Sequence, residues 1–239
     1  MKTEAIVLSK LKYFDNSLIV CFYSLEYGLF SSIIHLSKTK SGTLKQNLFF
    51  PLNILETEVN FKNTRNIQNI KYCNRQVVLT EICFNVYKTC IAQFIAEIIY
   101  KSIKEEESNP ELYNFIKNTI ILLENSKNFS NIHLIFIKEF AKLLGFGITN
   151  NFCNETPYFS FKDGIFLPVF TTNEMSLEES ESKNFSQILE LNFNNFTLFS
   201  INNKLKQYFL ITMIKYYKIH FNGNFSIKSL EITTQIFHQ

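Results

Sequence analysis

The hydrophobic pattern of this chain changes its period once, close to residue 76. Up to Arg75 the apolar residues alternate with polar ones, most clearly over Leu55–Lys62, and this alternation predicts half-buried β-strands. Beyond Thr80 the apolar residues recur every three or four positions, which predicts helices with one buried face. The 239 residues should therefore fold as strands first and helices second.

Five short alternating segments make up the first part of the chain. They are Glu4–Leu11, Ser17–Ser24, Leu29–Leu36, Leu55–Lys62 and Asn66–Tyr72, and turn residues separate them. Five strands within the first 75 residues suit a small closed barrel, because closure removes the free sheet edges. The OB-fold is the five-stranded barrel that commonly binds single strands of nucleic acid.

The rest of the chain should be mainly helical. We expect helices over 80–104, 109–124, 130–145, 203–221 and 226–237, and an irregular region over 146–170 that contains a small β-hairpin. The acidic stretch 173–183 is typical of a solvated loop or a helix start. The predicted fold class is α+β, with an OB-fold nucleic-acid-binding domain over 1–76 and a helical domain over 77–239.

The positive charge of the chain is concentrated in the strand-patterned part. Residues 1–76 contain ten Lys and Arg against five Asp and Glu, whereas the remainder contains fourteen against sixteen. The net charge of +3 for the whole chain hides this asymmetry. A small basic β-module joined to a nearly neutral helical body indicates nucleic-acid binding rather than catalysis.

Catalytic signatures are missing from the sequence. The chain has only two Asp, its four His fall in separate predicted elements, and its six Gly form neither a P-loop nor a dinucleotide fingerprint. The five Cys contain no C-x-x-C pair, which favours buried thiols. Cys83 and Cys90 would share a helix face and could serve a metal, but two further ligands at suitable spacing are lacking. We expect no enzyme activity, no cofactor and no metal.

No segment reaches the roughly 20 apolar residues that a membrane helix needs. Charged residues, among them Lys10, Lys12 and Asp15, interrupt the N-terminal apolar pattern that a signal peptide would require. We therefore expect a cytoplasmic protein that makes no membrane contact.

The predicted barrel has both ingredients of a single-strand site, namely cations for the phosphates and aromatic rings for the bases. Lys10 and Lys12 share a strand face next to Tyr13 and Phe14, and a loop with Gly and Ser carries three more lysines. The candidate nucleic-acid-binding residues are Lys10, Lys12, Lys38, Lys40, Lys45, Lys62, Arg65, Lys71 and Arg75. For any one of these cations, an ordinary solvated surface is the alternative.

Several segments occur in a familiar order and spacing over nearly the whole chain, although none of them is a catalytic signature. In the first part they are Glu4–Leu8, Tyr13–Val20, the Tyr27-Gly28 turn and Pro51–Glu56. In the second part they are Phe94–Lys101, Glu105–Tyr113, Leu143–Phe146, Tyr216–His220 and Lys228–Glu231. This order resembles the RecO family of bacterial recombination and repair mediators, in the form found in Bacteroidetes-type bacteria.

The resemblance implies a protein that binds single- and double-stranded DNA, anneals complementary strands and, with RecR, helps to load RecA onto strands coated by single-strand-binding protein. It also implies contact with the acidic, Phe-ending C-terminal tail of single-strand-binding protein. For this tail the helical part offers Lys101, Lys104, Lys117, Lys138 and Lys142. Many relatives hold zinc with four Cys after the third helix, but between Phe146 and Pro168 this chain has only Cys153.

Two other classes of function stay open. In the first, the helical body is a scaffold or adaptor, and the barrel is structural and does not bind DNA. A gel shift with single-stranded DNA at low salt would separate this scaffold from a DNA-binding protein. The second is an enzyme, which would need a site that the sequence does not reveal.

Overall fold

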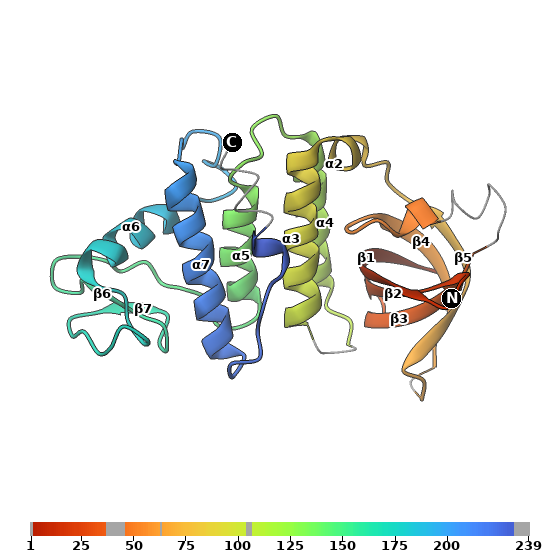
Figure 1. Cartoon of the computed structure of the whole chain (residues 1–239), viewed down its shortest axis with the longest axis horizontal. Helices are drawn as coiled ribbons and strands as arrows, with labels where there is room; N and C mark the ends of the chain where they lie inside the picture. Colours follow the sequence, from red (N-terminus) through yellow and green to blue (C-terminus); the bar gives the residue numbers. More distant parts are fainter. Residues whose placement is uncertain (1, 37–45, 63, 104–106, 232–239) are drawn as a thin grey trace. The chain divides into compact units, whose positions relative to one another are not determined.

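The structure is a computed structural model that describes residues 2–36, 46–62, 64–103 and 107–231 (Figure 1). The chain divides into two compact units, Met1–Ser126 and Lys127–Gln239. Among the described residues, the first unit therefore holds helices as well as the strands. The predicted domain boundary after residue 76 coincides with the end of the last barrel strand and stays a prediction as a domain boundary.

Five strands form a closed barrel in the order β1-β2-β3-β5-β4. Strands β3 and β5 pair in parallel, and the other neighbours pair antiparallel. Their bounds are β1 Lys2–Tyr13, β2 Ser17–Ser24, β3 Gly28–His35, β4 Ile54–Asn60 and β5 Ile67–Arg75. The alternation of apolar residues produces this barrel, because every second side chain points inward. The predicted fold class is confirmed: an N-terminal five-stranded barrel of the OB type precedes a mainly helical part with one small hairpin.

The barrel interior is packed with apolar side chains from all of its sides. Phe22 stacks on Phe30 with ring centroids 5.2 Å apart, and Phe49 meets Phe22 edge-on at 6.2 Å. Phe49 belongs to the short 3-10 helix η1, Asn47–Phe49, on the connection between β3 and β4. Because side chains fill the interior, a ligand of the barrel would have to bind on its outside, for example at the strand ends and loops.

Three helices complete the first unit: α2 Thr80–Phe84, α3 Val86–Ser102 and α4 Pro110–Asn125. The expectation of one unbroken helix over 80–104 is wrong, because the chain is extended at Asn85. The Asn85 side chain accepts hydrogen bonds from the amides of Tyr87 and Lys88 and so caps the start of α3. The predicted start of α4 is confirmed, with Asn109 as its N-cap and proline in the first turn.

A half-buried carboxylate joins the barrel to α4 within the first unit. Glu4 of β1 accepts a hydrogen bond of 2.9 Å from the Tyr113 hydroxyl and pairs with the Lys117 amine at 2.6 Å. Burial and the nearby Glu4 carboxylate raise the pKa of Tyr113, so its hydroxyl stays protonated and donates. Tyr23 of β2 lies against the Tyr113 ring, with centroids 6.2 Å apart. We refer to Glu4, Tyr113 and Lys117 as the latch.

The second unit contains α5 Ile132–Leu143, β6 Tyr158–Ser160, β7 Ile165–Leu167, α6 Glu179–Leu189 and α7 Asn203–His220. The acidic stretch predicted as a loop or helix start begins α6, where Glu178 and Glu181 form a capping box. The helix expected over 226–237 is wrong at its start, since residues 224–228 are not helical, and its end lies outside the described residues. None of the described helices combines the length and apolar character needed to cross a membrane.

The hairpin β6–β7 is held by hydrogen bonds and aromatic packing. The Asn151 side chain accepts from the Phe166 amide at 2.8 Å and donates to the Phe166 carbonyl at 2.9 Å. Phe159 packs against both Phe166 and Phe185 of α6. The turn needs Gly164, with φ +68°, because a Cβ there would lie 2.5 Å from the Tyr216 hydroxyl.

Replacing Tyr113 with Phe should lower the free energy of unfolding by about 1.5–3 kcal/mol, because one hydrogen bond to the half-buried, charged Glu4 carboxylate is lost. Urea unfolding of this variant, of Glu4→Gln and of the double variant measures the coupling between the two residues. The exposed Tyr72→Phe is the control and should be neutral. Strictly additive effects of the two latch substitutions would refute the latch.

Replacing Asn151 with Ala should lower the free energy of unfolding by about 2 kcal/mol. The amide and carbonyl of the buried Phe166 would each lose a hydrogen-bond partner. The neighbouring exposed Asn154→Ala is the control.

EDTA should leave the thermal midpoint of the wild type unchanged, since hydrogen bonds and aromatic packing hold the β6–β7 hairpin. A chelator-sensitive midpoint, or one zinc ion per chain by elemental analysis, would contradict this account.

Candidate nucleic-acid interface

Strand β1 is longer than the barrel needs. Strand β4 pairs only with its first residues, from Lys2 to Ile6, whereas β2 pairs with it as far as Tyr13. The end of β1 and the start of β2 therefore form a hairpin that extends past the partner strand β4. We refer to residues 9–18 as the β1–β2 hairpin.

A register shift between Val7 and Ser9 decides which side chains of this hairpin point the same way. Beyond the shift Lys10 lies opposite Val20 and Lys12 lies opposite Leu18. Residues directly opposite each other in an antiparallel pair project from the same face. The two amines thus share the face of the apolar Val20 and Leu18, and partial desolvation lowers the pKa of Lys10.

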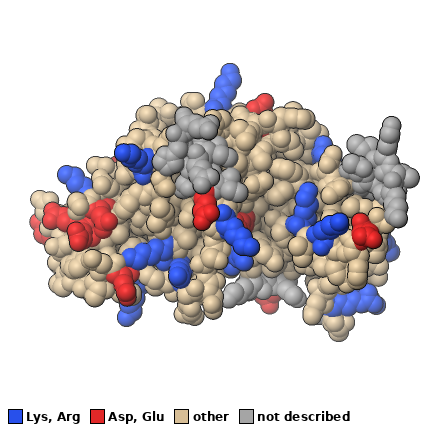
Figure 2. All heavy atoms as spheres, viewed as in Figure 1, with Lys and Arg blue, Asp and Glu red and all other residues tan. Residues whose placement is uncertain are grey.

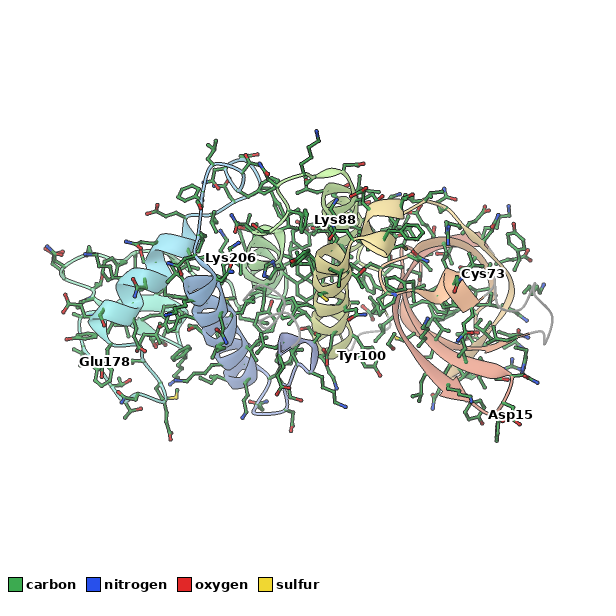
Figure 3. All side chains as sticks on the ribbon, turned by 45° about the horizontal axis from the view of Figure 1, so that its top comes forward. Asp15, Cys73, Lys88, Tyr100, Glu178 and Lys206 are labelled. Carbon is green, nitrogen blue, oxygen red and sulfur yellow. The ribbon has the colours of Figure 1, made fainter. Side chains whose placement is uncertain are left out.

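The tip of the hairpin exposes large apolar groups beside these lysines. Leu11 is 66% exposed, Tyr13 37% and Phe14 76%. The rings of Tyr13 and Phe14 lie 4.3 Å apart at an interplanar angle of 59°. Asp15 follows at the tip and is labelled at the outer edge of the barrel in Figure 3. Cations and exposed rings in one hairpin are the two components of a single-strand binding surface.

A second basic segment is the connection between β4 and β5, which carries the exposed Lys62 and Arg65. The buried Gln68 fixes its backbone: the side chain bonds the Lys62 amide at 2.8 Å, the Lys62 carbonyl at 3.0 Å and the Arg65 carbonyl at 2.7 Å. The backbone that carries both cations is thereby held in place. No signal in the sequence indicates this role of Gln68.

Strand β3 relates the two basic segments. Its end, His35, pairs with Ser17 at the base of the β1–β2 hairpin, and its Ser31 pairs with Ile67 just after the β4–β5 connection. These positions are about 14 Å apart along the strand. Both segments therefore lie within the length of one OB-fold site, which spans roughly four or more nucleotides.

The remaining predicted cations of the barrel lie outside the β1–β2 hairpin and the β4–β5 connection. Lys71 pairs with Glu58 at 3.8 Å on the outside of the barrel, where Lys2 also pairs with Glu56 at 3.2 Å. Arg75 ends β5 near Cys83, where burial raises the pKa of the thiol and the Arg75 charge opposes that rise. Lys38, Lys40 and Lys45 lie outside the described residues. Within the described part of the barrel, Lys10, Lys12, Lys62 and Arg65 are the predicted cations in the hairpin and the β4–β5 connection.

Two of the lysines expected to bind a partner make contacts inside their own units. Lys117 belongs to the latch with Glu4. The Lys138 amine donates to the carbonyls of Leu189 and Leu191 and pairs with Glu139 at 3.1 Å. Lys101 and Lys142 are exposed, and Lys104 lies outside the described residues.

The structure brings Lys138 and Lys142 together at a hollow of about 330 Å³ in the second unit, which we call the α5 hollow. Its other lining residues are Glu139, Ile148, Thr149, Asn150 and Leu189. Lys142 is its exposed cation, and Ile148 and Leu189 are its apolar wall. A pocket that joins apolar side chains to a cation suits an acidic peptide that ends in an apolar residue.

The cysteines do not form a common site. Cys21 and Cys90 are buried, and burial raises the pKa of the Cys21 thiol to about 11. Cys83 and Cys153 are exposed, so the expectation of buried thiols is wrong for these two. Among the described residues, no group of three or more His, Cys, Asp or Glu side chains could hold a metal ion.

Acidic side chains gather at one end of the second unit. In Figure 2 they lie over the end that contains β6, β7 and α6, and Glu178, Glu179 and Glu181 stand at the start of α6. Lys and Arg side chains are spread over the barrel and also over the second unit on the same face. The asymmetry visible on this face thus comes from the clustered acidic residues.

Comparison with known proteins agrees with this arrangement along the whole chain. Residues 1–75 match the family model for the recombination protein O N terminal, and residues 84–231 match that for the recombination protein O C terminal. The chain is 34% identical to the DNA repair protein RecO of Flavobacterium psychrophilum over 99% of both chains. It is 32% identical to that of Azobacteroides pseudotrichonymphae, over 99% of this chain and 98% of the relative.

Both family models are matched in order, and the two relatives are similar over nearly their full lengths. The barrel coincides with the N-terminal family model, and the helices α3 to α7 fall within the C-terminal one. This chain belongs to the RecO family of DNA repair proteins.

Proposed function

We propose that this protein is a recombination mediator that binds single- and double-stranded DNA through its barrel and anneals complementary strands. With RecR it would help to load RecA onto strands coated by single-strand-binding protein, in the cytoplasm at the nucleoid. The observation that carries the proposal is the β1–β2 hairpin, where Lys10 and Lys12 adjoin exposed aromatic rings. In the described part of the chain, neither lysine forms an ion pair.

The second basic segment supports the same proposal. Lys62 and Arg65 are exposed on a connection that Gln68 holds in place, so little order has to be gained when they contact phosphates. Phosphate contacts fix the position of a strand without reading its sequence. A mediator that acts on any stretch of DNA requires this kind of binding.

The alternative is a scaffold whose barrel is structural and does not bind DNA. It would explain the latch, which joins the barrel to α4. It does not explain why apolar rings and unpaired lysines occur together at the hairpin, because exposed apolar groups bring no benefit to a purely structural element. The DNA-binding proposal accounts for both the exposed rings and the lysines of the hairpin.

Neutralising Lys10, Lys12, Lys62 and Arg65 together should reduce the slope of log affinity against log salt for single-stranded DNA by about 3, since each contact contributes about 0.7. The loss of affinity should be uniform across sequences, because phosphates carry no base information. Fluorescence anisotropy with a labelled oligonucleotide measures both quantities over a salt series.

A matched control neutralises four exposed lysines of the second unit, namely Lys127, Lys183, Lys204 and Lys218. If this control reduced the slope as much as the barrel variant did, the principal DNA contact would lie in the helical part. If the wild type bound no DNA at low salt, the scaffold alternative would stand instead.

The resemblance to the family also supports recruitment by the acidic, Phe-ending tail of single-strand-binding protein, and we propose the α5 hollow as its site. Lys142→Glu should weaken binding of a tail peptide about tenfold, because a cation facing the peptide carboxylates becomes an anion. Lys101→Glu, which reverses an exposed charge in the first unit, is the control. Isothermal titration gives both affinities, and equal losses would exclude the α5 hollow.

A further inference from the structure

Phe14, at the turn of the β1–β2 hairpin, combines two features that are unfavourable for a large apolar residue. Its backbone has φ +52°, in the left-handed region that bulky residues avoid, and its side chain is 76% exposed. A residue in such a conformation is retained where its surroundings or its function require it. The position of Phe14 at a hairpin tip therefore calls for an explanation in terms of function.

The positive φ of the other two described non-glycine residues has a structural reason, namely burial in one case and the residue type in the other. Leu52, with φ +67°, is fully buried, and its amide donates to the Val7 carbonyl at 2.8 Å. Asn222, with φ +51°, is of a residue type that tolerates this region. Among the described residues, Phe14 alone joins positive φ to an exposed apolar side chain.

The charges around Phe14 indicate which part of a nucleic acid fits beside it. Lys10 and Lys12 lie before the tip and attract phosphates, whereas Asp15 directly follows Phe14 and repels them. Close to Phe14 a base is thus favoured over a phosphate. The centroid of the Tyr13 ring lies 4.3 Å from that of Phe14 at an interplanar angle of 59°, so the two rings are in contact at the tip.

We propose that Tyr13 and Phe14 form a stacking platform for an unpaired base, and that this platform makes the barrel prefer single strands to duplex. The inference rests on the proposed DNA-binding function and adds the chemical group that is recognised. A duplex keeps its bases stacked on one another, so it offers the platform a base only after local unpairing. Phosphate contacts, by contrast, are available in both forms of DNA.

The test uses the full-length protein with Phe14→Gly, which removes the ring and suits a positive φ. Three probes are compared by anisotropy: a single-stranded oligonucleotide, the same strand with abasic sites throughout, and a duplex of the same length. The variant should bind the ordinary single strand about tenfold more weakly than the wild type does. Its affinities for the abasic strand and the duplex should stay within about twofold of the wild type.

Two controls separate stacking from folding. The thermal midpoint of Phe14→Gly should be no lower than that of the wild type, because backbone strain is relieved. Phe14→Trp should retain the preference for the ordinary strand, and Phe84→Ala, which removes a ring that is 87% exposed on α2, should change none of the three affinities.

The outcomes distinguish the inference from the function on which it rests. If Phe14→Gly weakened all three probes equally, or weakened none, the stacking platform would be refuted while DNA binding by the barrel stood. If the wild type bound none of the three probes, both the platform and the DNA-binding function would be refuted together.

Discussion

The register shift in β1 is the constraint on which the arrangement of the first unit depends. Before it, β1 pairs with both β2 and β4 and closes the barrel around apolar side chains. After it, β1 pairs with β2 alone and carries Lys10 and Lys12 on the face of Val20 and Leu18. An extra residue in one strand bends that strand and turns its side chains. One strand thereby contributes to the barrel core and to the candidate DNA site.

In the first unit, the contacts that hold β1 against α4 and the exposed cations of the hairpin lie at opposite ends of β1. The latch of Glu4, Tyr113 and Lys117 engages the start of β1, whereas the hairpin lies at its other end. Paired charges such as Lys71 and Glu58 lie on the outer surface of β4 and β5. Because exposed ion pairs contribute little to stability, their main effect is to reduce the positive potential there. Among the described ion pairs, none involves Lys10 or Lys12 of the hairpin or Lys62 and Arg65 of the β4–β5 connection.

The second unit shows how a small hairpin can be held by ordinary side chains. The Asn151 amide continues the hydrogen bonding of β7, and Phe159 and Phe185 bury one face of the hairpin. The same unit contains the α5 hollow, lined by Lys142 of α5, by Ile148 after α5 and by Leu189 at the end of α6. A binding site for a peptide would in this way belong to a different compact unit from the site for DNA.

The sequence by itself determined the barrel, the order of the elements and the family, because alternation and three-to-four spacing depend on local geometry. The four cations of the hairpin and of the β4–β5 connection are all among the candidates that the sequence suggested, and their role in DNA binding stays a prediction. The break at Asn85, the pairing of Lys117 with Glu4 and the positive φ of Phe14 were decided by the tertiary structure. Each depends on a cap, a partner distant in sequence or a turn geometry, and none of these leaves a periodic signal. Only the fold shows that Lys117 is engaged by Glu4, since these two residues are more than a hundred positions apart in the sequence.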